Sequence, residues 1–473
     1  MGPLCQPASV AKTVKPCHTR PGRGFQSKID NRQMPMLRKL ALILLLLLLP
    51  TLLLAQAQPY PGPDLQATYQ RLLGEIQKIP IYDHHAHPGF ADDPDVDAMA
   101  APPNYSSPLR ERLDNPEMVA AMKALWGYPY DDMSPEHAKW VVQKKAELRK
   151  QLGDAGYWDG ILDKLGVETS VANRAMMDYL DPHRFKWVFF ADSFMWPFNN
   201  RDMTARNSDQ QVYIPLQEKM LHRWMQQQGV SGLPANFDDY LKFVSRTLED
   251  NQRKGGIAMK FEAAYFRSLH FGDPSKAQAE AVYRKYHAGG VPSMQDYTTF
   301  QDYIFRYLVS EGGRLHLPIH IHTAVGIGDY FDITHGNIMN LENVLRDPRY
   351  SNVTWVMIHG GYPLERIAIW LGAMKNVYLD SSLMEMDEYP AQFKQSLKEW
   401  LELFPDKITY GSDAFPYNDA MGAEESDWLG VQTSREALAG ALAEMVSEHE
   451  ISEARALQMA HAYLHDTAAG LYK

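Results

Sequence analysis

Cysteine is nearly missing from this chain: only Cys5 and Cys17 occur among 473 residues, and both lie close to the N-terminus. The remaining sequence therefore cannot form a disulfide or bind a metal ion through thiolates. Any metal site in it has to be built from histidine and carboxylate side chains, which also bind zinc and related divalent ions.

Long apolar runs are also missing, apart from Leu40–Leu54. Because Arg38 precedes this run and Ala55-Gln56-Ala57 closes it, the pattern predicts a secretory signal peptide over residues 36–57, cut before Gln58. The run is shorter than the roughly 20 residues that a transmembrane helix needs. We therefore expect an exported protein, periplasmic or extracellular, with no stable membrane anchor after cleavage.

Positive charge is scarce beyond this region. Residues 1–57 hold eight Lys or Arg and one Asp, which leaves 39 basic and 57 acidic residues in the predicted mature chain, a formal net charge of −18. Residues 1–35 are a basic leader of doubtful status upstream of the signal. Since nucleic-acid binding depends on clustered Lys and Arg, we expect no nucleic-acid partner.

Residues 58–473 alternate between short apolar strands and helical segments, with no low-complexity linker. This alternation predicts a parallel sheet with crossover helices, and eight strands predict a single (β/α)8 TIM barrel domain. The expected strands are Ile79–His85, Glu168–Ala172, Trp187–Ala191, Gly256–Phe261, Pro318–His322, Thr354–His359, Val377–Asp380 and Ile408–Tyr410.

Two connections between these strands are long, one from Pro88 to Gly166 and one from Asp192 to Gly255. Barrel active sites lie where the carboxyl ends of the strands meet. The insertions after strands 1 and 3 are therefore expected to act as lids over the site and to decide the substrate.

Metal-binding residues end four of the strands. In the first, alternation of side chains predicts that Asp83, His85 and His87 share one face, while Tyr82 and His84 point towards the helices. We expect His85 and His87 to converge on one metal ion.

The other ligands are expected at three later strand ends. His322 lies nearer the mouth than His320, which is expected one layer deeper and is kept as the alternative ligand. His359 precedes two glycines that allow a sharp turn. Asp413 follows the last strand beside small residues, and we expect it to be both ligand and general base.

Lys260 ends the fourth strand on the inward face, where a charge needs a partner. Three interpretations remain open: a carbamylated bridge between two metals, an ammonium that holds a substrate carboxylate, or an ion pair with Glu262. With Tyr265 and Arg267 it predicts a cationic, donor-rich arc near the metal that binds the substrate through an anionic group.

These motifs resemble the amidohydrolase superfamily, in its amidohydrolase-related branch. The resemblance rests on Asp83-x-His85-x-His87, on His322 and His359, and on Tyr410-Gly411-Ser412-Asp413, and it covers the predicted mature chain. The segments from Lys260 to Arg267 and from His359 to Pro363 are similar to the amidohydrolase domain fused to glutamine-synthetase-like proteins. The resemblance implies that His85, His87, His322 and Asp413 are metal ligands, and that His359 binds a second metal or orients water.

The predicted function is a metal-dependent hydrolase that uses an activated water to cleave an amide, ester or related C–N or C–O bond of a small, carboxylate-bearing substrate. Its cofactor is one or two divalent ions, zinc first, with manganese, iron or nickel as alternatives. The same branch includes decarboxylases and sugar-acid isomerases, which stay alternatives. A non-catalytic exported metal-binding protein is a more remote alternative. A homo-oligomer is compatible with the sequence.

Overall fold

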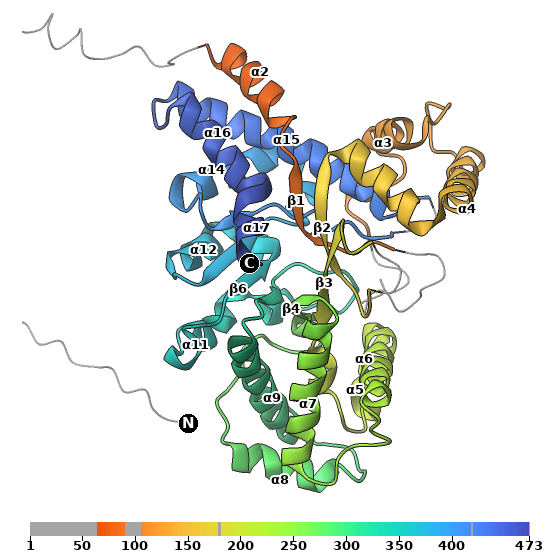
Figure 1. The fold of residues 1–473 in the computed structure, drawn as a ribbon, viewed down its shortest axis with the longest axis vertical. Coiled ribbons are helices and arrows are strands. Elements are labelled where there is room, and N and C mark those ends of the chain that lie inside the picture. Colours follow the sequence, from red (N-terminus) through yellow and green to blue (C-terminus); the bar gives the residue numbers. More distant parts are fainter. Residues whose placement is uncertain (1–63, 90–105, 178–180, 418–419, 473) are drawn as a thin grey trace, which may run out of the picture. The chain divides into compact units, whose positions relative to one another are not determined.

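The computed structural model describes residues 64–89, 106–177, 181–417 and 420–472. Within them, eight parallel strands form one sheet in the order β1 to β8, which confirms the predicted barrel (Figure 1). The strands are β1 Ile81–Ala86, β2 Val167–Asn173, β3 Phe185–Phe190, β4 Gly256–Phe261, β5 Ile319–His322, β6 Trp355–Ile358, β7 Val377–Asp380 and β8 Ile408–Thr409.

The barrel closes at its mouth through backbone hydrogen bonds between the first strand and the segment after the last. The amide of Asp413 donates to the carbonyl of His85 at 2.8 Å, and that of His84 donates to the carbonyl of Tyr410 at 2.9 Å. These bonds place His85 and Asp413, 328 residues apart in sequence, side by side.

The two long insertions lie where the sequence predicts them. The connection after β1 holds the short helix η1 and the helices α3 and α4, and the connection after β3 holds α5, α6 and α7. The bounds are η1 Leu109–Glu111, α3 Pro116–Trp126, α4 Pro135–Leu165, α5 Arg201–Thr204, α6 Ser208–Gln227 and α7 Phe237–Arg253.

The remaining helices surround or follow the barrel strands. They are α2 Leu65–Ile76, α8 Lys276–Tyr286, α9 Met294–Leu315, α10 Ile333–Gly336, α11 Glu342–Leu345, α12 Glu365–Ala368, α13 Met384–Asp387, α14 Pro390–Leu403, α15 Ala423–Ser447, α16 Glu453–His461 and α17 Thr467–Leu471. Figure 1 shows α7, α8 and α9 as neighbours.

Helix α7 illustrates why these segments are helical. The side chain of Asn236 accepts a hydrogen bond from the amide of Asp239 and so caps the first turn. Phe237, Tyr240 and Val244 recur at helical spacing and are buried. The helix therefore packs against its neighbours through one apolar face.

The deep end of the barrel interior is filled by the C-terminal helix. Tyr82, Val171, Val188 and Ala258, one from each of the first four strands, pack together with Ala468 of α17. Side chains from four different strands can meet one helix in this way only inside the barrel. The C-terminal helix thus acts as a plug beneath the strand ends.

Two expectations for β1 are wrong, because Tyr82 and His84 face the barrel interior and not the helices. The pairing of β1 with β2 slips between Asp83 and Ala86, where three steps along β1 match two along β2, which is a β-bulge. His84 faces inward on the same side of the strand as Tyr82 and stacks on His320 of β5 at 4.7 Å between ring centroids, and the slip turns His85 inward as well. Asp83 instead bonds to Ser412 and Ser170 and does not share the face of His85.

The predicted leader and signal peptide, residues 1–35 and 36–57, lie outside the described residues. Among the residues that the structure does describe, no helix has both the length and the apolar character to cross a bilayer.

Candidate metal centre

Five predicted ligands gather at the mouth of the barrel. Oδ1 of Asp413 lies 3.1 Å from Nε2 of His85 and 3.4 Å from Nε2 of His87, and the two histidine nitrogens are 3.3 Å apart. Nε2 of His359 lies 3.1 Å from Nδ1 of His322. Ligand atoms about 2.0–2.1 Å from a tetrahedral zinc ion are about 3.3 Å from one another, so these separations suit such an ion.

Three of these residues, from the ends of β1, β6 and β8, also form a candidate metal-ligating group. One ligand atom each from His85, His359 and Asp413 lie within 4.8 Å of one another. This group connects His85 and His87, at the end of β1, with the pair His322 and His359. The five residues can therefore hold one ion or two neighbouring ions.

The proton positions on His359 and His322 follow from their partners. Nδ1 of His359 lies 3.1 Å from the carbonyl oxygen of Ser382, and Nε2 of His322 lies 2.6 Å from that of Val325. A carbonyl only accepts, so each of these nitrogens carries the proton. The two unprotonated nitrogens then face each other at 3.1 Å, an arrangement that repels unless a cation binds to them.

Asn173, at the end of β2, controls the proton of His85. Its amide nitrogen lies 2.7 Å from Nδ1 of His85, while its amide oxygen is buried without a hydrogen-bond partner among the described residues. In this orientation Nε2 of His85 carries the proton and donates to Asp413. Rotation of the amide by 180° brings the oxygen to Nδ1 and leaves Nε2 free to bind a metal ion.

The backbone turns sharply at the candidate ligands. His359 and Asp413 have φ angles of 65° and 47°, a left-handed conformation that is uncommon outside glycine but is tolerated best by Asn, Asp and His. A Cβ atom on Gly411 would lie 2.5 Å from a carboxylate oxygen of Asp380. Strained turns of this kind gather at functional sites, where the surrounding structure holds them in place.

The local electrostatics also suit a cation. Burial lowers the pKa of His85 and His322 well below the usual value and lowers that of His359, so the imidazoles are neutral near pH 7. Burial alone would raise the pKa of Asp413, but the surrounding histidines outweigh it and the pKa lies well below the usual range. Neutral imidazoles and a carboxylate are the forms that bind metals.

A small cavity opens above these ligands. Tyr265 lines it, and the ring of Tyr265 lies 4.7 Å from that of His322. The other lining residues are His87, Glu111, Glu262, His322, Gly326, Ile327, His359, Leu383, Asp413, Phe415 and Tyr417.

Lys260 lies below this cavity and does not line it. Its ammonium is 3.3 Å from Oε1 of Glu262 and 3.4 Å from Nε2 of His85, and the side chain is fully buried. Of the three interpretations that the sequence leaves open, the structure contains the ion pair with Glu262.

Arg267 is turned away from the cavity, so the structure does not form the expected cationic arc. Its guanidinium donates to Asp302 at 2.6 Å and to Gln301 at 3.1 Å, and it lies over the ring of Phe271 at 4.5 Å. These contacts hold the loop after β4 against α9.

Sequence reasoning overlooked two groups beside the cavity. Asn173 ends a strand, and a polar residue at a strand end was a signal that pointed to it. Glu111 lies in the insertion after β1, where no local pattern distinguishes it from other acidic loop residues. The second insertion contributes indirectly: Gln210 of α6 donates a hydrogen bond to the carbonyl of Tyr265 at 2.7 Å.

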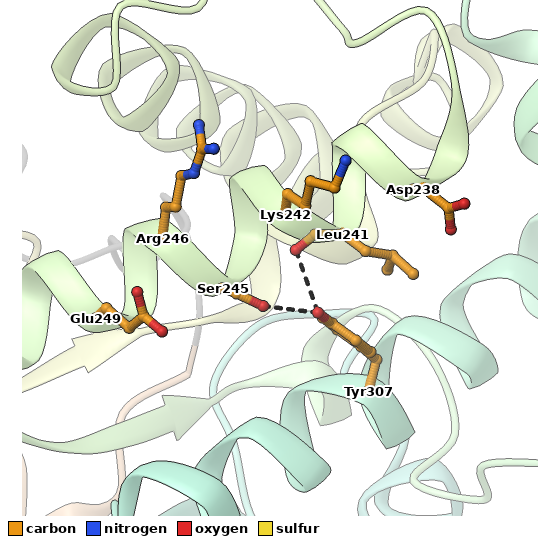
Figure 2. A pocket seen from close by; sticks show the side chains of 7 residues that line it. All are labelled: Asp238, Leu241, Lys242, Ser245, Arg246, Glu249 and Tyr307. Atoms are coloured by element: carbon orange, nitrogen blue, oxygen red, sulfur yellow. Dashed lines mark hydrogen bonds between the residues drawn. The ribbon is translucent and has the colours of Figure 1, made fainter.

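A second cavity lies between α7 and α9 (Figure 2). Ser245 and Tyr307, which line it, are hydrogen-bonded to each other at 2.6 Å, and Tyr307 also donates to the carbonyl of Leu241 at 3.3 Å. None of the candidate metal ligands lines this cavity. The cavity at the barrel mouth is therefore the candidate site.

One protein family matches part of the chain. Residues 249–473 match the family model described as Amidohydrolase. This segment includes Lys260, His322, His359 and Asp413, but it begins in α7, after His85, His87 and most of the two insertions. No curated protein matches the chain by sequence.

Solved structures share the fold over most of the chain. A protein from Lactobacillus casei that was assigned as a metal-dependent hydrolase has a TM-score of 0.55 at 18% identity, over 85% of this chain and 97% of its own. Uronate isomerase from Thermotoga maritima has 0.56 at 12% identity, over 88% and 99%. Glucuronate isomerase from Caulobacter crescentus has 0.53 at 13%, over 87% and 94%. The segment from residue 249 to the end thus matches the amidohydrolase family, on a barrel fold shared with these proteins.

Proposed function

We propose that this chain is a metal-dependent hydrolase of the amidohydrolase superfamily that cleaves a C–N or C–O bond of a small substrate. The observation that carries the proposal is the convergence of His85, His359 and Asp413 at the strand ends, with ligand atoms within 4.8 Å of one another. His87 and His322 complete the set of candidate ligands. The match of residues 249–473 to the amidohydrolase family supports the same reaction class.

The chemistry follows from the residues around the ligands. A divalent ion held by His85, His87, His322, His359 and Asp413 would supply Lewis acidity, lowering the pKa of a bound water and polarising a substrate carbonyl. Asp413 accepts the proton of the attacking water and passes it to the leaving group. The hydrogen bond from His359 to Ser382 fixes the imidazole so that Nε2 points towards the reacting atoms.

Isomerisation and decarboxylation are alternative reactions on the same fold, because both could use the same metal ligands. The three reactions differ in the fate of water. We expect one oxygen from solvent in the product, so reactions run in water enriched in ¹⁸O with a panel of amides, esters and lactones test the proposal by mass spectrometry. Turnover without incorporated label contradicts hydrolysis and favours isomerisation or decarboxylation.

Zinc is the proposed ion, with manganese, iron and nickel as alternatives. Elemental analysis of protein purified from its native compartment, followed by reconstitution of the metal-free protein with each ion in turn, identifies the ion that supports activity. A fully active protein without a stoichiometric metal would contradict the metal-dependent mechanism.

Export is part of the same proposal, and it rests on the sequence of residues 36–57. Intact-mass measurement of the protein from the native host is expected to give a chain that begins at Gln58. A cytosolic protein that retains residues 36–57 would contradict export without affecting the proposed chemistry.

A further inference from the structure

A polar layer lies beneath the candidate ligands, in a part of the barrel interior that the proposed reaction does not use. The hydroxyl of Tyr472, which follows α17, lies 2.5 Å from Nε2 of His84 and 2.7 Å from Nε2 of His320. Nδ1 of His84 in turn lies 3.0 Å from Oδ2 of Asp380. Side chains from β1, β5, β7 and the segment after α17 thus form one chain of hydrogen bonds.

The hydroxyl of Tyr472 is the centre of this chain. The side chains of His84, His320 and Asp380 are fully buried, and Nδ1 of His320 has no hydrogen-bond partner among the described residues. A hydroxyl carries one proton, so it donates to one imidazole and accepts from the other. Without it, Nε2 of each histidine would lose its partner inside the barrel, which is unfavourable.

Asp380 connects the polar layer to His359. Its Oδ1 accepts a hydrogen bond from the amide of Ser382 at 3.0 Å, and the carbonyl of Ser382 accepts one from Nδ1 of His359 at 3.1 Å. A Cβ atom on Gly411 would lie 2.5 Å from Oδ2 of Asp380, so the carboxylate also packs against the turn that leads to Asp413. A shift of Asp380 would therefore displace two candidate ligands.

The polar layer also bears on the bulge in β1. His84 faces the interior in the regular alternation of the strand, and the slip of β1 against β2 turns the next residue, His85, inward as well. Side chains of adjacent strand residues ordinarily point to opposite faces, so this arrangement depends on contacts that hold both rings in place. For His84 these contacts are the bonds to Tyr472 and Asp380. Without them β1 could shift and turn Nε2 of His85 away from Asp413.

We propose that Tyr472 is a positioning residue of the metal centre. Its hydroxyl holds His84 and His320 in place and so keeps the ligands at the ends of β1, β5 and β6 at the separations that a metal ion requires. Tyr472 acts through these residues, since it does not line the cavity above the ligands. This inference rests on the proposed function, because it requires that the site bind a metal ion.

The variant Tyr472→Phe removes the hydroxyl and keeps the ring. A competition titration against a zinc-binding dye is expected to show at least tenfold weaker zinc binding than in the wild type, the effect usual for residues that orient metal ligands. The visible absorption spectrum of the cobalt-substituted protein reports the geometry of the ligands and should change as well.

Tyr240→Phe is the matched control. The hydroxyl of Tyr240 also makes a buried hydrogen bond, to the carbonyl of Phe194 at 2.6 Å, but it lies in the insertion after β3. This variant should unfold at a lower temperature than the wild type and keep the wild-type zinc affinity and cobalt spectrum. The comparison separates an effect on the metal centre from the general cost of a lost buried bond.

A second variant keeps the test decisive if Tyr472→Phe folds poorly. Tyr472→Ala leaves room for a small aromatic molecule, and the space is open to solvent because Tyr472 is only half-buried. The variant is purified with phenol, which supplies both the ring and the hydroxyl and should restore zinc affinity. Toluene, which supplies the ring alone, should not restore it.

The outcomes separate this inference from the proposed function. If Tyr472→Phe keeps the zinc affinity and cobalt spectrum of the wild type, if Tyr240→Phe loses as much zinc affinity, or if phenol and toluene act equally, the inference is wrong and the metal-dependent reaction stands. Failure of both Tyr472 variants to fold, even with phenol, would show that the hydroxyl serves the fold and would also overturn it. If the wild type binds neither zinc nor cobalt, the proposed function fails together with the inference.

Discussion

The amide of Asn173 lies 2.7 Å from Nδ1 of His85, and this contact decides which nitrogen of His85 can bind a metal ion. An acceptor at Nδ1 fixes the proton there and leaves Nε2 free, next to Asp413 and His87. Partners of this kind orient metal ligands and contribute to metal affinity.

Replacement of Asn173 by leucine should therefore weaken zinc binding by about 10–100-fold, or about 1.4–2.7 kcal/mol. The measurement is a competition titration against a zinc-binding dye. Asn173→Asp keeps an acceptor at Nδ1 and should retain or improve the affinity. Asn376→Leu loses a hydrogen bond at the opposite end of a barrel strand and should leave it unchanged. Equal zinc affinity of all four proteins would show that Asn173 does not orient His85.

Replacement of a direct metal ligand should reduce metal binding more than replacement of Asn173. His85→Ala removes one of few ligands, so the purified protein should contain less than a tenth of the wild-type metal and have no measurable activity. Elemental analysis and activity measurements on the same sample test this. His183→Ala, at an exposed position, is the control. A His85→Ala protein with stoichiometric metal and full activity would move the metal site away from β1.

Much of this arrangement could be predicted from the sequence, because strands that alternate with helices and end in histidine or aspartate specify both the barrel and the edge where these residues meet. The bulge in β1 could not be predicted from the sequence. The expected alternation of side chains holds only where a strand pairs with its neighbour in an unbroken register. His84 faces inward on the same side as Tyr82, and the slip against β2 turns His85 inward as well. Which strand residues share a face therefore depends on pairing that a single strand does not encode.

The surroundings of the ligands were harder to predict for a related reason. Arg267 follows β4 closely, and proximity in sequence suggested a place near the metal, but Asp302 of α9 holds its guanidinium. Glu111 reaches the cavity from an insertion whose path depends on tertiary contacts, such as the bonds from Arg110 to the carbonyls of Glu385 and Glu388. Strand-end residues are fixed by local pattern, whereas residues on long connections are fixed by their packing.

A buried ionic cluster between α4 and α15 predicts a pH-dependent contribution to stability. Burial alone would raise the pKa of Glu424, but Lys145, Arg149 and Tyr157 lower it to about 2. Because the pKa is lower in the folded state than in the unfolded state, Glu424 contributes stability above about pH 4.5, and this contribution is lost as the pH falls towards 2.

Thermal unfolding of the wild type and of Glu424→Gln between pH 3 and pH 7 tests this contribution. The variant should unfold at a lower temperature at pH 6, and the difference should narrow at pH 3. Glu280→Gln, at an exposed position on α8, should follow the wild type throughout. A difference that is constant with pH, or that widens on acidification, would contradict the lowered pKa of Glu424.

The variant Asp413→Asn separates proton transfer from metal binding. Asparagine keeps an oxygen ligand of the same shape, and it tolerates the left-handed backbone conformation at this position, where φ is 47°, but it cannot accept the proton of the attacking water. Turnover should fall by roughly 10²–10⁴, the usual contribution of a positioned general base, in protein whose metal content is verified in parallel. Asp406→Asn, whose side chain is 80% exposed, should keep full activity. Near-normal turnover by a metal-loaded Asp413→Asn protein would refute the general-base role and favour a reaction that does not consume water, such as isomerisation or decarboxylation.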